Sequence, residues 1–462
     1  MPAEECPPRR AGGPGERVGT GHIVFTVCVL LGINTMNFFD RQILPAVQEK
    51  VRKDWHLTDS DLGWLGTAFI LLYAAVGLPL GRLADVWRRK WLLAGGVGLW
   101  SLLTLGSGFA WSFWSLFALR LGVGVGEATC APAASSLIGD LVPAERRARA
   151  LALFMLGLPL GLALSFLVSG SIAERYGWQY AFFVAGLPGL LLAVAALFIA
   201  DPRPVRKAEG GVRNEERPSG SAFAIVLSLP TMWWLIASGA LHNFNMYALG
   251  TFLASFLKRY HGASVGRAGQ VSGLVYGAGA LGIFAAGWLG DWAFRRSVSG
   301  RLYVAAAATA AAAPCLVLAL AVPPGQLWPC AAWLLPACLL LYAYYGPVYA
   351  TIQDIVEPSL RGTAMAVYFC AMYFLGAILG PVATGWASDW CARRAAGGAA
   401  EVTELHKAVG LHDAMYLIPL LDVALVAVLF AAARTVKGDY LRLQKRTGAI
   451  SEGASREDEG KP

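Results

Sequence analysis

Charged residues are scarce in this chain. Lys, Arg, Asp and Glu make up 15% of its 462 residues, whereas about 25% is usual for a soluble domain. It also lacks a polar stretch long enough to fold as a separate soluble domain, and it has no G-x-x-x-x-G-K phosphate-binding loop. We therefore expect neither an enzyme nor a pump driven directly by ATP.

Cysteines are few and lack the spacing of metal ligands. The chain has 8 of them, and most lie inside apolar stretches, as do Cys28, Cys130, Cys315, Cys338 and Cys370. Neither a disulfide framework nor a zinc site is indicated, and we expect no metal and no cofactor. The net charge of +8 suits basic loops beside an anionic membrane leaflet, so no nucleic-acid partner is expected.

Apolar residues, by contrast, are abundant. They form 56% of the chain, and the mean hydropathy is +0.53. Stretches of about 20 apolar residues are long enough to cross about 30 Å of hydrocarbon. They recur around residues 22–46, 62–83, 91–110, 113–139, 148–173, 179–200, 230–257, 268–290, 302–322, 327–352, 362–388 and 411–433. We expect an all-α, multi-pass membrane protein with twelve transmembrane helices in two halves of six.

The polar segments set the expected organisation. We predict an N-terminal tail (1–21), a six-helix half (22–200), a polar linker (201–228), a second six-helix half (229–434) and a C-terminal tail (435–462). The charged C-terminal tail is expected to be disordered. Lys and Arg concentrate in the tails, the linker and alternate loops, as in the Arg88-Arg89-Lys90 cluster. This bias predicts that both termini lie in the cytoplasm.

The two halves are related by an internal repeat. The segment Gly81–Lys90 returns about 206 residues later as Gly287–Arg296, and Asn37-Phe38 returns at the same offset as Asn243-Phe244. A membrane protein built from two similar halves is typical of a transporter in which one half rocks against the other.

Ionisable residues inside the membrane break this symmetry. Asp40, Arg41, Arg120 and Glu127 all lie in spans of the first half. Their counterparts are uncharged: Met246, Tyr247, Leu334 and Leu341. A charged side chain at mid-bilayer costs a few kcal/mol, so we expect these four groups to face one another or a cavity.

Two interpretations of this cluster compete. In one, it is a buried ion-pair network that fixes helix register. In the other, which we favour, Asp40 or Glu127 changes its protonation as the halves rock. Arg41 and Arg120 could alternatively hold an anionic group of a substrate, because guanidinium pairs with carboxylate or phosphate through two hydrogen bonds.

Uncharged polar residues add candidates for a cavity. The set comprises Asn37, His242, Asn243, Asn245, Tyr247 and Tyr345. Such residues can contact a substrate. They can equally hydrogen-bond a neighbouring helix or pack, and the sequence leaves both interpretations open.

Several motifs resemble those of the major facilitator superfamily. Gly81–Lys90 is similar to its loop signature, Arg120-x-x-x-Gly124-x-Gly126 to its fourth-helix motif, and Gly157–Gly161 to its fifth-helix motif. Val86 and Arg88 depart from the commonest loop pattern. The resemblance implies a cytoplasmic gate made of Gly81, Asp85, Arg89, Asp140, Arg147, Asp291, Asp354 and Arg361.

Within that superfamily the chain most resembles the spinster family, as a bacterial member. Asn37–Arg41, Gly122–Ala128 and Leu137–Leu141 carry the likeness. It implies a monomer in the bacterial inner membrane that moves lysophospholipids or sphingoid-base phosphates, with protons and membrane lipids as partners. It also implies that Asp40 and Glu127 are protonation sites, with Arg41 and Arg120 as their partners or the anion's.

Two alternatives remain open. Related transporters of sugar acids and other small organic anions share an Asn-x-x-Asp-Arg pattern and a Gly-Glu-Ala. The aromatic second half, with Phe244, Tyr345 and Phe374, suits an acyl chain better. A receptor or scaffold that keeps the fold without cycling would be indifferent to loss of the intramembrane charges.

Overall fold

The computed structural model describes residues 19–86, 88–142, 150, 153–201, 222–357, 360–397, 399 and 401–458, with side chains left out at 74, 78, 79, 81–86, 132, 135, 222 and beyond 445. All regular structure in these ranges is helical. Gly81, Asp85 and Arg147, which were expected at a gate, lie outside the described side chains.

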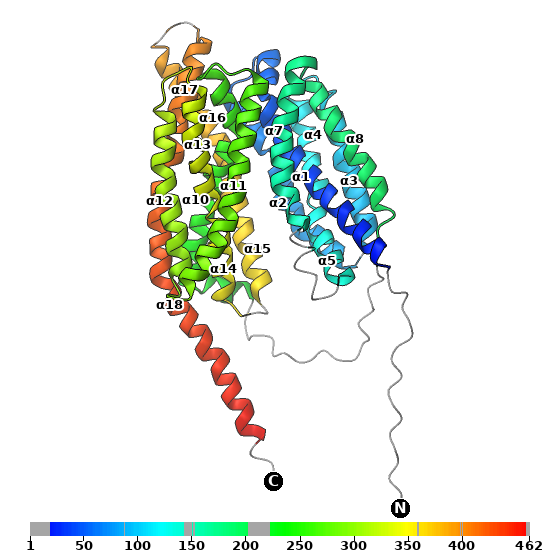
Figure 1. Cartoon of the computed structure of the whole chain (residues 1–462), viewed down its shortest axis with the longest axis vertical. Helices are drawn as coiled ribbons and strands as arrows, with labels where there is room; N and C mark the ends of the chain where they lie inside the picture. Colours follow the sequence, from blue (N-terminus) through cyan, green and yellow to red (C-terminus); the bar gives the residue numbers. More distant parts are fainter. Residues whose placement is uncertain are drawn as a thin grey trace, which may run out of the picture.

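Helices of the first half run back and forth across one bundle (Figure 1). They are α1 (Thr20–Trp55), α2 (Asp59–Val86), α3 (Arg89–Ser107), α4 (Phe113–Glu127), α5 (Cys130–Leu141), α7 (Gly157–Tyr176) and α8 (Trp178–Ala196). Helix α1 begins on what we call the terminus side, and it ends on the far side. There His56 adopts a left-handed backbone conformation (φ 52°) that turns the chain into α2.

The second half lies beside the first and also begins on the terminus side. Its helices are α9 (Ala222–Leu227), α10 (Pro230–Arg259), α11 (Val265–Phe294), α12 (Gly300–Leu320), α13 (Leu327–Tyr342), α14 (Tyr345–Asp354), α15 (Arg361–Ala371), the π-helix η2 (Met372–Ala377), α16 (Leu379–Ala395), α17 (Glu404–Met415) and α18 (Leu417–Asp458).

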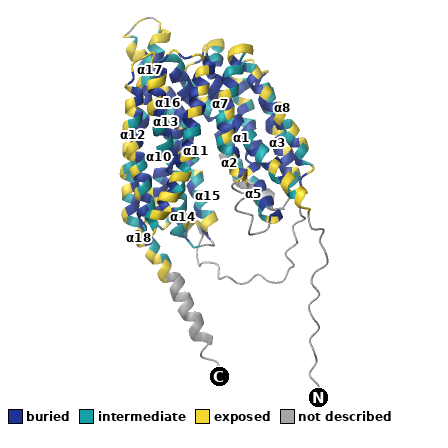
Figure 2. Ribbon diagram, in the orientation of Figure 1, coloured by how far each residue is buried: buried dark blue, intermediate teal, exposed yellow. Residues whose placement is uncertain are grey.

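The expected membrane spans are present, although some are built from two or three helices. Among the described residues, nine helical segments are long and apolar enough to cross a bilayer. The span predicted at 113–139 breaks between α4 and α5, and that at 327–352 breaks between α13 and α14. Large apolar residues such as Leu191 and Phe284 are 72% and 70% exposed, and Figure 2 shows exposed positions along the outer helices of both halves. The chain is an integral, multi-pass membrane protein.

The tail after residue 434 differs from expectation where it is described. Instead of ending in disorder, α18 continues without interruption to Asp458. Lys, Arg, Leu and Gln, which dominate residues 441–446, all have high helix propensity, so the helix of the last span propagates into the tail.

Two pairs of helices join the halves, α2 with α16 and α7 with α11. Glycines allow close approach there. A Cβ on Gly63 would lie 2.5 Å from the backbone oxygen of Pro381, and one on Gly269 would lie 2.5 Å from that of Phe166. Both glycines lie in the first turns of helices that start on the far side, so the halves meet most tightly at that end.

Candidate functional site

A cavity of about 390 Å³ lies between the two halves. Its walls come from helices of both halves, and Arg41 is the one charged residue among the described residues that line it. Tyrosines supply much of the wall: Tyr247, Tyr276, Tyr342, Tyr345, Tyr349 and Tyr373. A mostly aromatic cavity with a single cationic group suits a ligand that is apolar in part and anionic in part.

Arg41 is held at the cavity by a buried ion pair with Glu127. Its Nε lies 2.8 Å from Oε2 of Glu127, whose side chain is fully buried. Oε1 of Glu127 has no hydrogen-bond partner among the described residues. The Arg41 guanidinium also lies over the rings of Phe38, Tyr73 and Phe69, with Cζ 4.9, 4.8 and 5.4 Å from their centroids. Aromatic faces stabilise a cation without neutralising it.

A second buried pair joins Asp40 to Arg120 and is more fully bonded. Nη1 of Arg120 lies 3.1 Å from Oδ1 of Asp40, and Nη2 donates to the backbone oxygen of Asp40 at 3.0 Å. Thr104 donates to the other carboxylate oxygen, Oδ2, at 2.5 Å. Both oxygens of Asp40 are therefore occupied, whereas Glu127 keeps one oxygen without a partner.

The structure thus brings Asp40, Arg41, Arg120 and Glu127 together as two pairs, each formed between α1 and α4. Arg120 and Glu127 lie two turns apart on the same face of α4, as their spacing of seven residues requires. Arg120 binds Asp40 and Glu127 binds Arg41, which are adjacent residues of α1. Only Arg41 reaches the cavity wall.

The uncharged candidates divide into two groups. Asn243, Tyr247 and Tyr345 line the cavity. Asn37, His242 and Asn245 are buried elsewhere in the first and second halves and do not line it.

Helix packing explains the positions of two of these side chains. Asn245 turns toward α18, where its Nδ2 donates to Oδ1 of Asp422 at 2.9 Å. His242 stacks on Tyr344 with ring centroids 4.0 Å apart, and its two nitrogens have no partner among the described residues. In both cases helix packing within the second half orients the side chain.

On the terminus side, the described gate candidates form ion pairs or hydrogen bonds inside one half. Arg89 binds Asp140 in the first half. In the second half, Arg301 lies 2.6 Å from Asp291 and also binds Asp354. Arg361 donates from Nε to the backbone oxygen of Gln353 at 3.1 Å.

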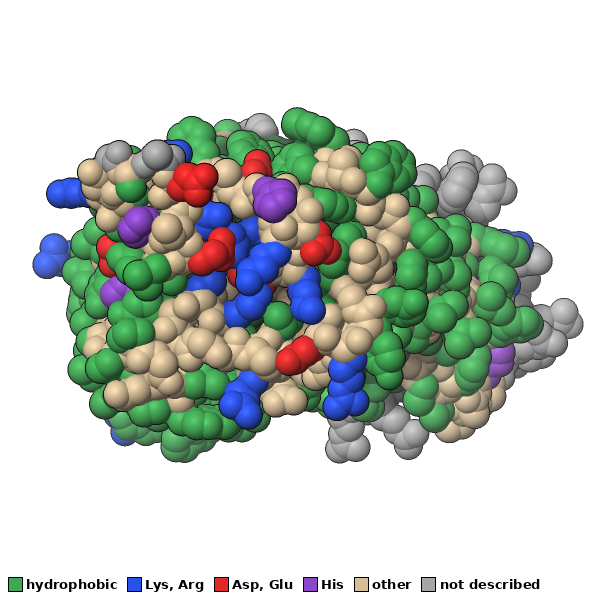
Figure 3. Space-filling model, turned by 90° about the horizontal axis from the view of Figure 1, so that it is seen from above, with side chains coloured by type: hydrophobic (Ala, Val, Ile, Leu, Met, Phe, Trp, Pro, Cys, Tyr) green, Lys and Arg blue, Asp and Glu red, His purple; other side chains and the backbone are tan. Residues whose placement is uncertain are grey.

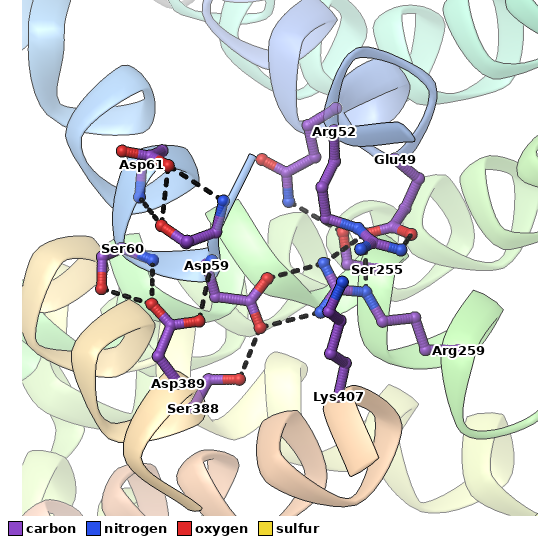
Figure 4. Close-up of polar contacts among 12 residues, drawn as sticks. Glu49, Arg52, Asp59, Ser60, Asp61, Ser255, Arg259, Ser388, Asp389 and Lys407 are labelled. Carbon is purple, nitrogen blue, oxygen red and sulfur yellow. Dashed lines mark hydrogen bonds and ion pairs between the residues drawn. The ribbon is translucent and has the colours of Figure 1, made fainter. Parts of the chain in front are cut away.

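The far side carries a charged cluster that our sequence analysis missed (Figure 3). Arg259 at the end of α10 binds Glu49 of α1 at 2.6 Å and Asp59 of α2 at 2.7 Å. Arg52 of α1 binds Glu404 of α17 at 2.5 Å. Glu49, Arg52 and Asp59 are almost fully buried, and every one of these pairs joins the two halves. Figure 4 shows the contacts of Arg259 with Glu49 and Asp59.

A signal for this cluster exists in the repeat. Arg52-Lys53 and Lys258-Arg259 stand at the same offset, about 206, as the loop signature. Each pair lies at the far-side end of the first helix of its half. Nothing local in the sequence shows that the other half covers these cations.

His261 lies beside this cluster without adding charge to it. It is buried against Phe256 and Tyr260, with ring centroids 5.2 Å from each. Burial, and secondarily the nearby His412, lowers the pKa of His261 from 6.5 to about 4. The imidazole is therefore neutral at pH 7.

Comparison with known proteins agrees with this architecture. The family model of the Major Facilitator Superfamily matches residues 30–381. An MFS-type efflux pump of Mycolicibacterium smegmatis is 30% identical over 384 residues, covering 81% of this chain and 86% of that protein. Protein spinster homolog 1 of Mus musculus is 31% identical over 400 residues, covering 80% of this chain and 74% of that protein.

A solved structure is also closely similar. A bacterial homologue of the human lysosomal transporter spinster, described as inward-facing and unoccupied, superposes with a TM-score of 0.81 at 26% identity, covering 91% of this chain and 99% of that one. The chain belongs to the major facilitator superfamily and, within it, is a transporter of the spinster type.

Proposed function

We propose that this chain is a proton-coupled transporter that moves an amphiphilic anion, such as a lysophospholipid or a sphingoid-base phosphate, by alternating access. The observation that carries the proposal is the position of Arg41. It is a cation on the wall of a largely aromatic cavity, and its partner Glu127 is a fully buried carboxylate.

The orientation follows from the distribution of charge and of contacts. The bias of basic residues toward the tails and the linker supports a terminus side that lies in the cytoplasm. The described polar contacts between the halves extend from the level of Thr67, which donates to Ile378 O at 3.1 Å, to the far side. This arrangement supports an inward-facing state, the state described for the similar bacterial homologue. A bacterial inner membrane is the matching location.

Proton coupling follows from competition for one arginine. While Glu127 is ionised it holds Arg41. A proton placed on the unpartnered Oε1 of Glu127 removes the negative charge and frees the guanidinium for the anionic group of a substrate. One proton then accompanies one substrate charge, so the site carries no net charge either when it is empty and deprotonated or when it holds both proton and anion.

The neighbouring pair has a different part in this proposal. Asp40 is bonded at both carboxylate oxygens by Arg120 and Thr104, so a proton would have to displace an existing bond. We assign Asp40 and Arg120 to holding α1 against α4, with Asp40 as a protonation site only after that pair separates.

The cavity wall supports an amphiphilic substrate. Beyond Arg41, Gln42 and Tyr276 line the cavity, and Oε1 of Gln42 and the hydroxyl of Tyr276 lack a hydrogen-bond partner within the described part of the chain. They could bind the polar backbone of a lipid headgroup, while Phe69, Met246 and Phe369 contact its acyl chain. The cavity and both ion pairs form within one chain, so we propose a monomer.

Uptake into proteoliposomes tests this function. A labelled lysophospholipid, a sphingoid-base phosphate and a hexuronate are offered with and without an inward proton gradient. Glu127→Gln is expected to reduce gradient-driven lipid uptake by more than about tenfold and to remove its pH dependence. Glu401→Gln, at an exposed carboxylate outside the cavity, is the matched control and should leave uptake unchanged.

Other results would revise the proposal in defined ways. Unchanged pH dependence in Glu127→Gln would exclude Glu127 as the coupling residue. Uptake of hexuronate alone would assign the chain to the small organic anions. Uptake of none of the three, by protein that is folded and correctly inserted, would favour a receptor or scaffold.

A further inference from the structure

The far-side ends of α2 and α11 are each bound by a carboxylate from the opposite half. At α2, Asp389 of α16 accepts from the backbone nitrogens of Asp59 at 3.0 Å and Ser60 at 2.8 Å. It also accepts from the Ser60 hydroxyl at 2.5 Å. The first N–H groups of a helix have no partner inside the helix. Thr58 accepts from the N–H of Asp61, and Asp389 binds the two N–H groups before it, those of Asp59 and Ser60.

At α11 the same contact recurs with the halves exchanged. Glu174, near the end of α7, accepts from the backbone nitrogen of Gly266 at 2.9 Å and from the Ser264 hydroxyl at 3.0 Å. A carboxylate at a helix N-terminus gains both from hydrogen bonds and from the helix dipole. Each half therefore binds a helix start of the other.

The two contacts occupy equivalent places in the repeat. Helix α7 is the fifth span of the first half, and α16 completes the fifth span of the second. Asp389 follows Glu174 by about 215 residues, close to the offset of about 214 that relates Arg147 to Arg361. A contact repeated by symmetry on both interfaces between the halves is a property of the architecture.

The two sites are not equally protected. Beside Asp389, the carboxylate of Asp59 is bound by Ser388 at 2.5 Å and by Arg259 (Figure 4). Glu174 has no such cluster among its described neighbours, and its side chain is exposed. Water competes more strongly for an exposed carboxylate, so the Asp389 contact should be the stronger one.

We propose that Asp389 and Glu174 are paired latches of a far-side gate, and that both must release before the cavity opens to that side. Opening separates α16 from α2 and α7 from α11, which breaks both contacts. The freed N–H groups and carboxylates then become accessible to water, so the cost of opening is moderate and a single substitution can shift the balance. This inference rests on the rocking motion of the proposed function and is independent of the substrate.

Distances between spin labels in nanodiscs test the latches without any substrate. In a background without native cysteines, Trp111→Cys and Trp328→Cys place labels on exposed far-side positions of the first and second halves. Arg88→Cys and Arg296→Cys do the same on the terminus side. Opening of the far side lengthens the far-side distance, between the labels at positions 111 and 328. It shortens the terminus-side distance, between the labels at positions 88 and 296.

Each latch is removed by an isosteric substitution. Asp389→Asn is expected to raise the ratio of open to closed far side by about tenfold and Glu174→Gln by about threefold. The double variant should give roughly the product of the two, because the latches lie on different interfaces. Asp61→Asn is the matched control, because Asp61 lies in the same first turn of α2 but accepts only from Thr58 in its own half.

Three results would overturn the inference. The far-side distance could stay unchanged in both single variants and in the double variant. Asp61→Asn could lengthen it as much as Asp389→Asn does. The far-side distance could also lengthen without the terminus-side distance shortening, which would indicate local loosening in place of a gate. A chain that passes this test but transports no lipid would disprove the proposed substrate alone.

Discussion

The two ends of the molecule use ion pairs in opposite ways. On the far side, Arg259 and Arg52 each bind acids of the opposite half. On the terminus side, Arg89 and Arg301 bind acids of their own half. Among the described residues, the polar contacts that join the halves lie on the far side or at mid-membrane, and none lies on the terminus side.

This difference indicates which ion pairs stabilise the present conformation relative to one that is open on the far side. A pair inside one half moves as a unit and costs nothing when the halves rock. A pair between halves must be broken, and its partners must find water. The far-side pairs therefore favour the present state, while the terminus-side pairs stabilise each half separately.

Removing the central cation of the far-side cluster should have the largest effect. Arg259→Gln leaves Glu49 and Asp59 buried without their shared partner, a change that typically costs about 3–5 kcal/mol. Opening the far side relieves this cost by hydrating both carboxylates. We expect a lower midpoint of thermal unfolding and a predominantly long far-side distance between spin labels.

Two further variants separate gate opening from general damage. Arg259→Lys keeps the charge and should restore much of the closed population. Arg267→Gln, at an exposed arginine on the same side, should change neither measurement. A far-side distance that stays short in folded Arg259→Gln would mean that the cluster contributes to stability without selecting a conformation.

Close helix packing should contribute less than the central charge. A Cβ on Gly385 of α16 would lie 2.3 Å from the backbone oxygen of Asp59, so Gly385→Ala must push α16 away from α2. Overpacking of this kind costs about 1–3 kcal/mol. We expect a shift toward the open far side, measured with the same pair of labels.

The control for this prediction lies in the same span. Gly362 has no heavy atom within 4 Å of an added Cβ among the described neighbours. Gly362→Ala should therefore be neutral or slightly stabilising, by at most about 1 kcal/mol, through higher helix propensity. Equal destabilisation by both alanines would remove the argument from close packing.

The sequence predicted the fold because its signals are local. Twelve apolar stretches, a repeated loop signature and the bias of Lys and Arg each appear within short windows. The proximity of Asp40, Arg41, Arg120 and Glu127 also followed from their cost inside a membrane. Which acid binds which arginine did not follow, because a helix rotation of a few tens of degrees decides it, and that rotation is set by packing on both sides of α1.

The far-side cluster could not be predicted for a different reason. Glu49, Asp59 and Arg259 stand at the ends of spans, where charged residues are ordinarily solvated. Glu49 and Asp59 are buried because the second half covers them, and the Arg259 side chain is in turn covered by these residues of the first half. Burial that depends on the approach of a distant segment leaves no periodic pattern in the chain, and only the repeated pair Lys258-Arg259 hinted at a shared position.

Substitution of Arg301 tests the ion pairs that lie inside one half on the terminus side, and it should have the smallest effect. It binds Asp291 and Asp354 inside the second half, and Asp291 is largely exposed. Exposed pairs contribute about 0–1 kcal/mol, so Arg301→Gln should lower the midpoint of thermal unfolding only slightly. Because neither bond spans the halves, the far-side and terminus-side distances should both stay unchanged. A shift in either distance would show that pairs within one half also select the conformation, and the contrast between the two ends would then have to be abandoned.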